Sequence, residues 1–173
     1  MHTATAEDFD KIYSVMQSNF PDNEYRDYTA QKKLLDKKNY FIKTESSEAG
    51  TIEAFIAYWK FNGFIYIEHI AVAGENKGKG IGSSILKRFT ANGKLPLIAE
   101  IEPPEHSCLA QKRWRFYQRH GFYLNERRYI QPSLGKNKNP AELRIISYPA
   151  PLTGEEFCSV REILYKNVYK VKE

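Results

Sequence analysis

The sequence predicts a mixed α/β fold built around one β-sheet, and three observations support this. Two segments rich in β-branched and aromatic residues, 51–61 and 64–72, flank Asn62-Gly63, the strongest short-range signal for a β-hairpin. Helical periodicity occurs both before and after this hairpin. Short apolar strands then alternate with further helical segments, an order typical of helices packed on one sheet.

The first part of the chain is predicted to be helical. Thr5-Ala6-Glu7-Asp8 has the form of a helix N-cap. Apolar residues follow at helical spacing until Pro21: Phe9, Ile12, Met16 and Phe20. Residues 24–37 indicate a second, looser helix, and residues 40–43 start an extended segment that leads to the hairpin.

The segments after the hairpin alternate between helix and strand. A helix is predicted from Gly80 to a stop at Gly93, followed by a short buried strand over 95–101. Pro103-Pro104 interrupts that strand, and a helix capped by Ser107 then continues to a second glycine stop at Gly121.

The C-terminal part is predicted to hold two strands and a last helix. The strands cover 122–130 and 141–148, and a polar, basic loop joins them. Thr153-Gly154-Glu155-Glu156 repeats the capping pattern, and an amphipathic helix follows it. With 173 residues, of which 42% are hydrophobic, residues 1–173 are expected to form a single domain.

Composition excludes several classes of protein. The net charge of +5 is modest, and its basic residues concentrate in 77–88 and 112–128, which favours an acidic ligand over a nucleic-acid track. Two cysteines without CxxC spacing and a polar N-terminus favour a cytoplasmic setting. No apolar run approaches the length that a bilayer requires, so we expect no membrane span. Four scattered histidines give no reason to expect a metal site.

A glycine turn between the second hairpin strand and the next helix is the strongest functional signal. Glycines let the backbone approach a ligand closely, and the amides at a helix start attract anions. Lys79 is followed by Gly80 instead of the hydroxyl of a Walker loop, and Gly82 comes one place too early for the dinucleotide fingerprint. A surface turn without a ligand is the remaining alternative.

Two motifs together resemble the GNAT N-acetyltransferase superfamily. Lys77-Gly78-Lys79-Gly80-Ile81-Gly82 is similar to the family's Gln/Arg-x-x-Gly-x-Gly/Ala motif, with Lys in place of Gln or Arg. Residues 113–122, with Phe116-Tyr117 and Gly121-Phe122, resemble the family's downstream helix and following strand. The sequence departs from this pattern at Ala110 and Arg113, where many members carry Asn and Ala.

The resemblance implies a GNAT-like single, mixed, mostly antiparallel sheet of about six to seven strands flanked by helices. It covers about residues 5–148, and the extra helix over about 153–173 lies beyond this core. It also implies acetyl-CoA as co-substrate and an amine as acceptor. The implied cofactor-binding residues are Ile70, Ala71, Val72, Lys77, Gly78, Lys79, Gly80, Ile81, Gly82, Ser83, Ser84 and Tyr117.

Glu68 is the first candidate for a general base. Strand periodicity puts it on one face with Tyr66 and Ile70, where it could project next to the reacting thioester. A glutamate that faces solvent or pairs with a lysine is the alternative. His69 is expected to point to the opposite face, in a structural role.

Glu100, Glu102 and Tyr117 are the other candidate catalytic residues. The two carboxylates are expected to share one face of a strand, where they could attract a cationic amine or replace Glu68 as base; a polar strand end is the alternative. Tyr117 matches the family tyrosine that protonates the departing thiolate, and a core tyrosine is the alternative reading.

The leading function is transfer of an acetyl group from acetyl-CoA to a primary amine of a small molecule or peptide, by direct attack in a ternary complex. A catalytically weak CoA-binding sensor or interaction module of the same fold is the alternative. A nucleic-acid surface at 112–115 and 127–129 is disfavoured because several of its aromatic residues are predicted to face inward. The terminal helix could cover the domain or pair with a second copy in a homodimer.

Overall fold

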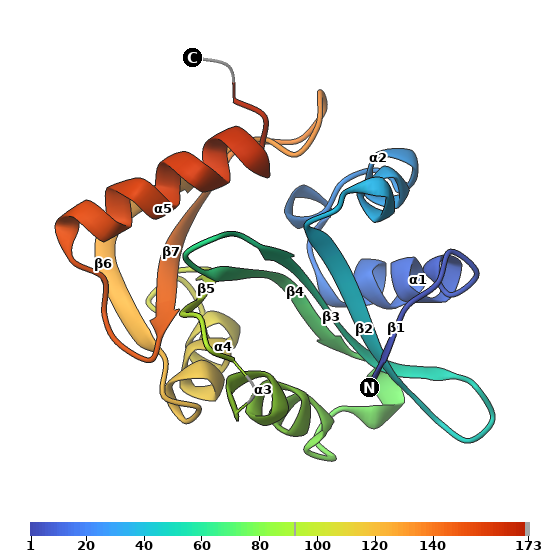
Figure 1. Cartoon of the computed structure of the whole chain (residues 1–173). Helices are drawn as coiled ribbons and strands as arrows, with labels where there is room; N and C mark the ends of the chain where they lie inside the picture. Colours follow the sequence, from blue (N-terminus) through green and yellow to red (C-terminus); the bar gives the residue numbers. More distant parts are fainter. Residues whose placement is uncertain (92, 172–173) are drawn as a thin grey trace. The chain divides into compact units, whose positions relative to one another are not determined.

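The computed structural model of the protein, shown in Figure 1, describes residues 1–91 and 93–171. Seven strands follow the order β1-β2-β3-β4-β5-β7-β6 in the sheet, which confirms the predicted mixed α/β fold. The chain divides into two compact units, Met1–Leu97 and Ile98–Glu173, which are described in turn. Within the described residues, no helix is both long enough and apolar enough to cross a membrane.

The first unit consists of a strand meander with helices before and after it. Its elements are β1 (His2–Thr3), α1 (Phe9–Asn19), η1 (Asp22–Glu24), α2 (Tyr28–Lys32), η2 (Lys33–Asp36), β2 (Tyr40–Ser46), β3 (Ile52–Lys60), β4 (Ile65–Val72), η3 (Gly74–Asn76) and α3 (Ile81–Ala91). Neighbouring strands from β1 to β4 pair antiparallel, and the predicted hairpin is confirmed because Lys60 pairs with Ile65 on either side of the Asn62-Gly63 turn.

Helix α1 packs on the meander through its apolar side. It contacts β3 and β4, and its predicted apolar residues Phe9, Ile12 and Met16 are buried. The predicted cap differs in detail. The Asp8 carboxylate accepts hydrogen bonds from the backbone and hydroxyl of Thr5, at 2.9 and 3.0 Å, and makes no capping bond to the helix itself.

The predicted helix over 24–37 is wrong as a continuous element. Tyr25 has an extended backbone, with φ −141° and ψ 160°, so the turn before it cannot continue. Asp27 then caps a new start, because its carboxylate accepts a 2.8 Å hydrogen bond from the amide of Ala30. The result is two short 3₁₀ turns around a five-residue helix.

The second unit contains β5 (Leu97–Ile101, whose first residue belongs to the first unit), α4 (Cys108–Gln118), β6 (Tyr123–Gln131), β7 (Ala141–Tyr148) and α5 (Gly154–Asn167). Strands β6 and β7 pair antiparallel. Both predicted helix caps are confirmed: Ser107 accepts from the Ala110 amide, and Thr153 forms a reciprocal capping box with Glu156.

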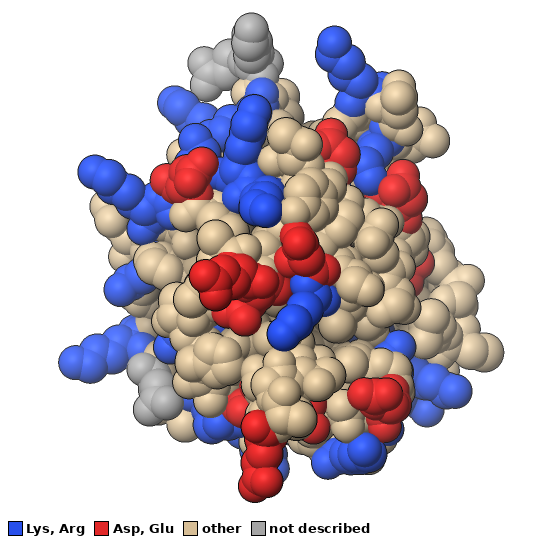
Figure 2. Space-filling view, turned by 90° about the vertical axis from the view of Figure 1, so that its right-hand side faces the viewer, with Lys and Arg blue, Asp and Glu red and all other residues tan. Residues whose placement is uncertain are grey.

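The predicted amphipathic character of α5 is confirmed, because Phe157, Val160 and Leu164 are buried on one side of it. On α4, Ala110 and Tyr117 are buried, whereas Leu109 is 64% exposed. Helix α4 ends at Gln118, three residues before the predicted glycine stop; Gly121 has φ +82°, and a Cβ there would lie 3.2 Å from the ring of Tyr148. On the face shown in Figure 2, basic and acidic side chains are mixed.

Candidate active site

The glycine turn has the backbone geometry of an anion-binding loop. Gly78 and Gly80 have φ of +83° and +80°, which residues with a side chain rarely adopt. A Cβ at either position would meet nothing within 4 Å, so backbone conformation and not packing requires glycine at both places. Backbone amides in such turns converge into concavities that bind anions.

Helix α3 begins directly after this turn. Its first intrahelical hydrogen bond joins the Ser84 amide to the Gly80 carbonyl at 3.0 Å, so the amides of residues 81–83 lie before it. These amides carry the positive end of the helix dipole. Lys79 Nζ donates a 2.8 Å hydrogen bond to the side chain of Asn76, which is itself buried. Residues 77–84 therefore combine the positive charge of the lysines, the positive end of the α3 dipole and a backbone that glycines leave open to a ligand.

Strand β4 leads into the turn and contains a β-bulge. His69 pairs with Ala57 and Ile67 pairs with Tyr58, so Glu68 is an extra residue without a partner on β3. Beyond the bulge, Ile70, Ala71 and Val72 pair in regular register with Ile56, Phe55 and Ala54. These three residues, the predicted contributors of a carbonyl-polarising amide, therefore form the last part of β4 before the glycine turn.

The bulge corrects one prediction. An extra residue breaks the period-two alternation, and Glu68 and His69 both contact the segment 24–26. Arg26 Nη1 donates to Glu68 Oε1 at 2.6 Å, and His69 Nε2 lies 2.8 Å from the carbonyl oxygen of Glu24. His69 therefore does not point away from Glu68 to the opposite face.

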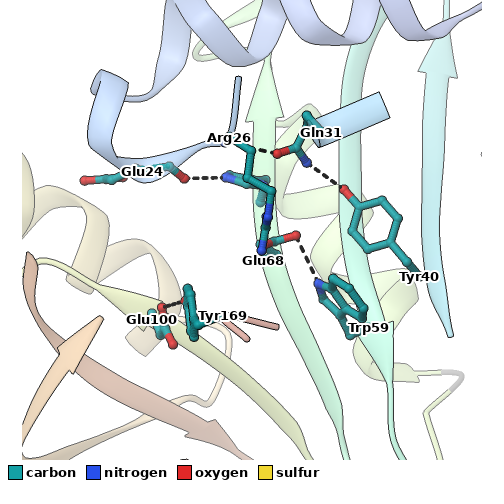
Figure 3. Close-up of polar contacts among 9 residues, drawn as sticks. Glu24, Arg26, Gln31, Tyr40, Trp59, Glu68, Glu100 and Tyr169 are labelled. Atoms are coloured by element: carbon teal, nitrogen blue, oxygen red, sulfur yellow. Dashed lines mark hydrogen bonds and ion pairs between the residues drawn. The ribbon is translucent and has the colours of Figure 1, made fainter. Parts of the chain in front are cut away.

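Glu68 is a buried carboxylate with charged and neutral partners (Figure 3). Besides the Arg26 ion pair, Glu68 Oε2 accepts a 3.0 Å hydrogen bond from Trp59 Nε1. Burial alone raises the pKa of Glu68, but the charge of Arg26 and the hydrogen bonds from Arg26 and Trp59 bring the pKa below its ordinary value. Glu68 is thus held as an anion.

His69 has one ring nitrogen bonded and the other unpartnered. Because Nε2 faces a carbonyl oxygen, Nε2 must carry the hydrogen. Nδ1 is then an acceptor, and it is buried without a hydrogen-bond partner among the described residues. Burial lowers the pKa of His69, so the ring is held neutral.

The candidate carboxylates of the second unit have different partners. Glu100 lies on β5 and accepts hydrogen bonds from Tyr129 at 2.5 Å and from Tyr169 at 2.6 Å, the second of which is drawn in Figure 3. Glu102 lies one residue beyond β5 and pairs with Arg113 Nη1 at 3.3 Å. Glu100 thus accepts hydrogen bonds from two phenols, and Glu102 pairs with a guanidinium.

Tyr117 is a buried residue of α4. Its ring packs against Phe116 and Phe122, with centroids 5.2 Å apart in both cases. Burial raises the pKa of the Tyr117 phenol to about 12, although the nearby charge of Arg113 lowers it slightly. At neutral pH the phenol is protonated, as a proton donor must be.

Comparison with known proteins identifies the family. A model described as "Acetyltransferase (GNAT) domain" matches residues 36–124, more than half of the 173-residue chain. The chain belongs to the GNAT acetyltransferase family. This confirms the resemblance found in the glycine turn and in the Phe116-Tyr117 segment.

Individual GNAT relatives agree with this assignment. "Putative acetyltransferase YjbC" of Bacillus subtilis (strain 168) is 26% identical over 165 residues, covering 93% of this chain and 82% of the relative. A solved "Putative acetyltransferase from GNAT family" from Bacteroides thetaiotaomicron is 27% identical with a TM-score of 0.86, covering 99% and 98% of the two chains. A GNAT superfamily phosphinothricin acetyltransferase from Sinorhizobium meliloti, solved in complex with AcCoA, shares the fold at 18% identity, with a TM-score of 0.58 and 89% of each chain covered.

The GNAT motifs did not lead to the residues that surround Glu68. Arg26 was missed because it lies in a segment interpreted as helix, and His69 because a bulge leaves no mark in the sequence. Trp59 could have been found from the hairpin register, since a turn at Asn62-Gly63 places it opposite Tyr66, two residues before Glu68.

Proposed function

We propose that the protein transfers an acetyl group from acetyl-CoA to a primary amine by direct attack in a ternary complex. The observation that carries this proposal is the glycine turn over 77–84, where two positive-φ glycines precede a helix N-terminus. This arrangement suits the pyrophosphate of a coenzyme. A GNAT relative solved with AcCoA supports the same cofactor.

The chain is proposed to act as one acyltransferase domain. The GNAT match over residues 36–124 includes part of both compact units, which favours a shared function over two separate ones. We assign CoA binding to Ile70, Ala71, Val72, the residues 77–84 and Tyr117. Of these, an amide at Ala71 or Val72 would polarise the thioester carbonyl.

The reaction requires a balanced set of proton transfers. The acceptor ammonium first loses a proton to a base, and the neutral nitrogen attacks the thioester carbonyl carbon. The C–S bond breaks as the amide forms, and the nitrogen loses its second proton to solvent water, which also returns a proton to Tyr117. The departing thiolate takes a proton from Tyr117, whose raised pKa keeps that proton available at neutral pH.

The base is proposed to be one of Glu68, Glu100 and Glu102. The Arg26 ion pair makes Glu68 a weaker proton acceptor than an ordinary glutamate, because its pKa is lowered. Replacing each carboxylate in turn with Gln identifies the base: the variant that lacks it loses the acidic limb of the pH–rate profile. The other two variants keep that limb, whatever their loss of rate.

A catalytically weak CoA-binding module is the second candidate function. It is favoured by one observation, that both oxygens of Glu68 are already bonded, to Arg26 and to Trp59. Such a protein would bind acetyl-CoA and release no thiol in the presence of amines.

One experiment separates the two functions. Thiol release from acetyl-CoA is followed with polyamines, aminoglycosides, amino acids and peptide amines, and each product is identified by mass. Calorimetry measures acetyl-CoA binding in parallel. Amine-dependent thiol release with an acetylated product supports the transferase. Binding without release supports the sensor, and the absence of binding contradicts both.

A further inference from the structure

A small groove lies at the turn end of the β3–β4 hairpin, within the first unit. Its volume is about 290 Å³, and it is lined by two lysines, two asparagines and two phenylalanines: Lys38, Asn39, Phe41, Lys60, Phe61 and Asn62. These residues belong to the start of β2 with the segment before it, and to the end of β3 with the turn after it. The volume is at the low end of ligand pockets, so it suits a single ring system.

The antiparallel register brings the two sides of the groove together. The amide of Lys60 donates to the carbonyl oxygen of Asn39 at 2.8 Å, one step beyond the pair formed by Tyr40 and Trp59. Lys60 is therefore directly opposite Asn39, and Phe41 follows two residues later on the same face of the sheet. Paired strands thus hold an ammonium group, an amide and an aromatic ring near one another.

The two rings of the groove are partly exposed and are held by other aromatic side chains. Phe61 stacks on Trp59, with ring centroids 6.4 Å apart and an angle of 1° between the planes. Phe41 stacks on Tyr58, with centroids 5.4 Å apart and an angle of 26°. Rings fixed in this way lose little freedom when a ligand binds, and they favour a planar aromatic partner.

The charged side chains that line the groove are both cations. Lys38 and Lys60 are exposed, and neither forms an ion pair with any residue in 1–91 or 93–171. An anionic group in the groove would therefore have two ammonium partners, each able to bind a phosphate or carboxylate as a point charge. The side-chain amides of Asn39 and Asn62 add donors and acceptors for the edge of a ring or for the anion.

The groove is separate from the glycine turn proposed to bind CoA. Strand β4 starts after the hairpin turn and ends before the glycine turn, and its eight residues span roughly 25 Å. An anion in the groove therefore does not compete directly for the amides of residues 81–83.

We propose that this groove is a second ligand site, which binds a planar aromatic ring that carries a phosphate or a carboxylate. Phe41 and Phe61 contact the ring, and Lys38 and Lys60 contact the anion. This inference goes beyond the proposed acetyl transfer and does not rest on it. Because Phe61 stacks on Trp59, ligand binding should change the fluorescence of this tryptophan.

Probes that carry the ring, the charge or both test the proposal. Trp59 and Trp114 are the two tryptophans of the chain, so a Trp114→Phe protein reports on Trp59 alone. This protein is saturated with CoA and titrated with benzyl phosphate, benzyl alcohol and inorganic phosphate, by fluorescence and by calorimetry. Benzyl phosphate should bind about tenfold more tightly than either other probe, because only it meets both the rings and the ammonium groups. Adenosine 5′-monophosphate and benzoate then show whether a nucleotide or a carboxylate is preferred.

Variants of the lining residues assign the site. Lys38→Gln and Lys60→Gln should each weaken the binding of benzyl phosphate about two- to fivefold, and the double variant should bind it no better than benzyl alcohol. Because both lysines are exposed, these variants should keep the thermal transition of the unsubstituted protein. Lys87→Gln is the control, since it removes an exposed charge of α3 outside the groove and should leave the affinity unchanged. Phe61→Leu should reduce the affinity for benzyl phosphate towards that for inorganic phosphate.

Three results would overturn the inference. Benzyl phosphate could bind no more tightly than benzyl alcohol and inorganic phosphate, or Lys87→Gln could weaken it as much as Lys60→Gln. Binding that is seen without CoA and abolished by saturating CoA would assign the probe to the CoA site instead. Each of these results leaves the proposed acetyl transfer intact, because thiol release tests that function. If the protein binds no CoA, the same titrations without CoA still test the groove.

Discussion

Arg26 Nη1 lies 2.6 Å from Glu68 Oε1, and the two side chains are only 8% and 4% exposed. The ion pair joins the segment between η1 and α2 to the bulge of β4. Trp59 occupies the other oxygen of Glu68, and Gln31, which accepts from the Arg26 amide, donates to Tyr40. Because the pair is this deeply buried, each ionised group relies on the opposite charge of its partner for stabilisation.

Removing one member of this pair should destabilise the protein strongly. Glu68→Gln or Arg26→Gln breaks the buried ion pair by removing one of its charges, so each should lower the free energy of unfolding by about 3–5 kcal/mol. The double variant Arg26→Gln/Glu68→Gln should lose less than the sum of the two single changes. Urea unfolding at neutral pH measures all three.

An exposed ion pair provides the control for this prediction. Arg88 pairs with Glu45 but is 46% exposed, so Arg88→Gln should change the unfolding free energy by less than about 1 kcal/mol. Equal effects of Arg88→Gln and Arg26→Gln, or strictly additive effects of the Arg26 and Glu68 changes, would contradict a buried, coupled pair.

His69 should make stability depend on pH below about 6.5. Burial lowers its pKa in the folded state, so between the two pKa values the unfolded chain binds a proton that the folded chain does not. The contribution of His69 is therefore complete above pH 6.5 and is lost as the pH falls towards its folded pKa, by at most about 1.4 kcal/mol per pH unit.

His69→Gln isolates this effect. Glutamine keeps a donor for the Glu24 carbonyl and does not titrate, while every other histidine is unchanged. The difference in unfolding free energy between the two proteins should shrink as the pH falls from 7 to 5. Glu68, whose lowered pKa makes its contribution fall only below about pH 4.5, does not interfere. Parallel pH profiles for the two proteins would rule out a buried neutral His69.

Local signals predicted much of the fold and less of the site. The Asn62-Gly63 turn, the caps at Ser107 and Thr153 and the glycine turn each depend on a few adjacent residues, and each was found from the sequence. The contacts of Glu68 and Glu100 join residues 42 and 69 positions apart. A one-residue bulge also reversed the expected side of His69, because it changes the alternation that such predictions assume.

Tyr117→Phe removes the phenol hydroxyl and keeps the ring as a CoA contact, so it should slow turnover with little effect on acetyl-CoA binding. If Tyr117 protonates the thiolate, its loss should lower kcat about 100-fold or more, while KM for acetyl-CoA stays nearly constant. Its pKa of about 12 also means that its ionisation should not reduce the rate of the unsubstituted protein up to roughly pH 10. Tyr123→Phe, at a 47% exposed position, is the control. An unchanged kcat in Tyr117→Phe would exclude the acid role.

Alanine in the glycine turn should separate strain from ligand binding. Gly78→Ala and Gly80→Ala force a Cβ into the left-handed region, at a cost of about 1–2 kcal/mol each, and disturb the amides proposed to bind phosphate. Gly50 has a similar φ of +77° and equally open surroundings in the loop between β2 and β3. Gly50→Ala should therefore lose similar stability and keep its affinity for acetyl-CoA, whereas the other two should lose about tenfold in calorimetric affinity. Equal affinities in all three variants would count against the turn as the phosphate site.

Lys170→Gly should stabilise the protein, whereas Lys166→Gly, four residues earlier, should destabilise it. At φ +57° lysine is strained, and glycine would relieve about 1 kcal/mol of that strain, less its own entropic cost. Lys166 lies in the last turn of α5, where glycine should cost up to about 1 kcal/mol of helix stability. Urea unfolding of the two variants should thus give shifts of opposite sign. Destabilisation by both changes would mean that the left-handed turn does not form in solution.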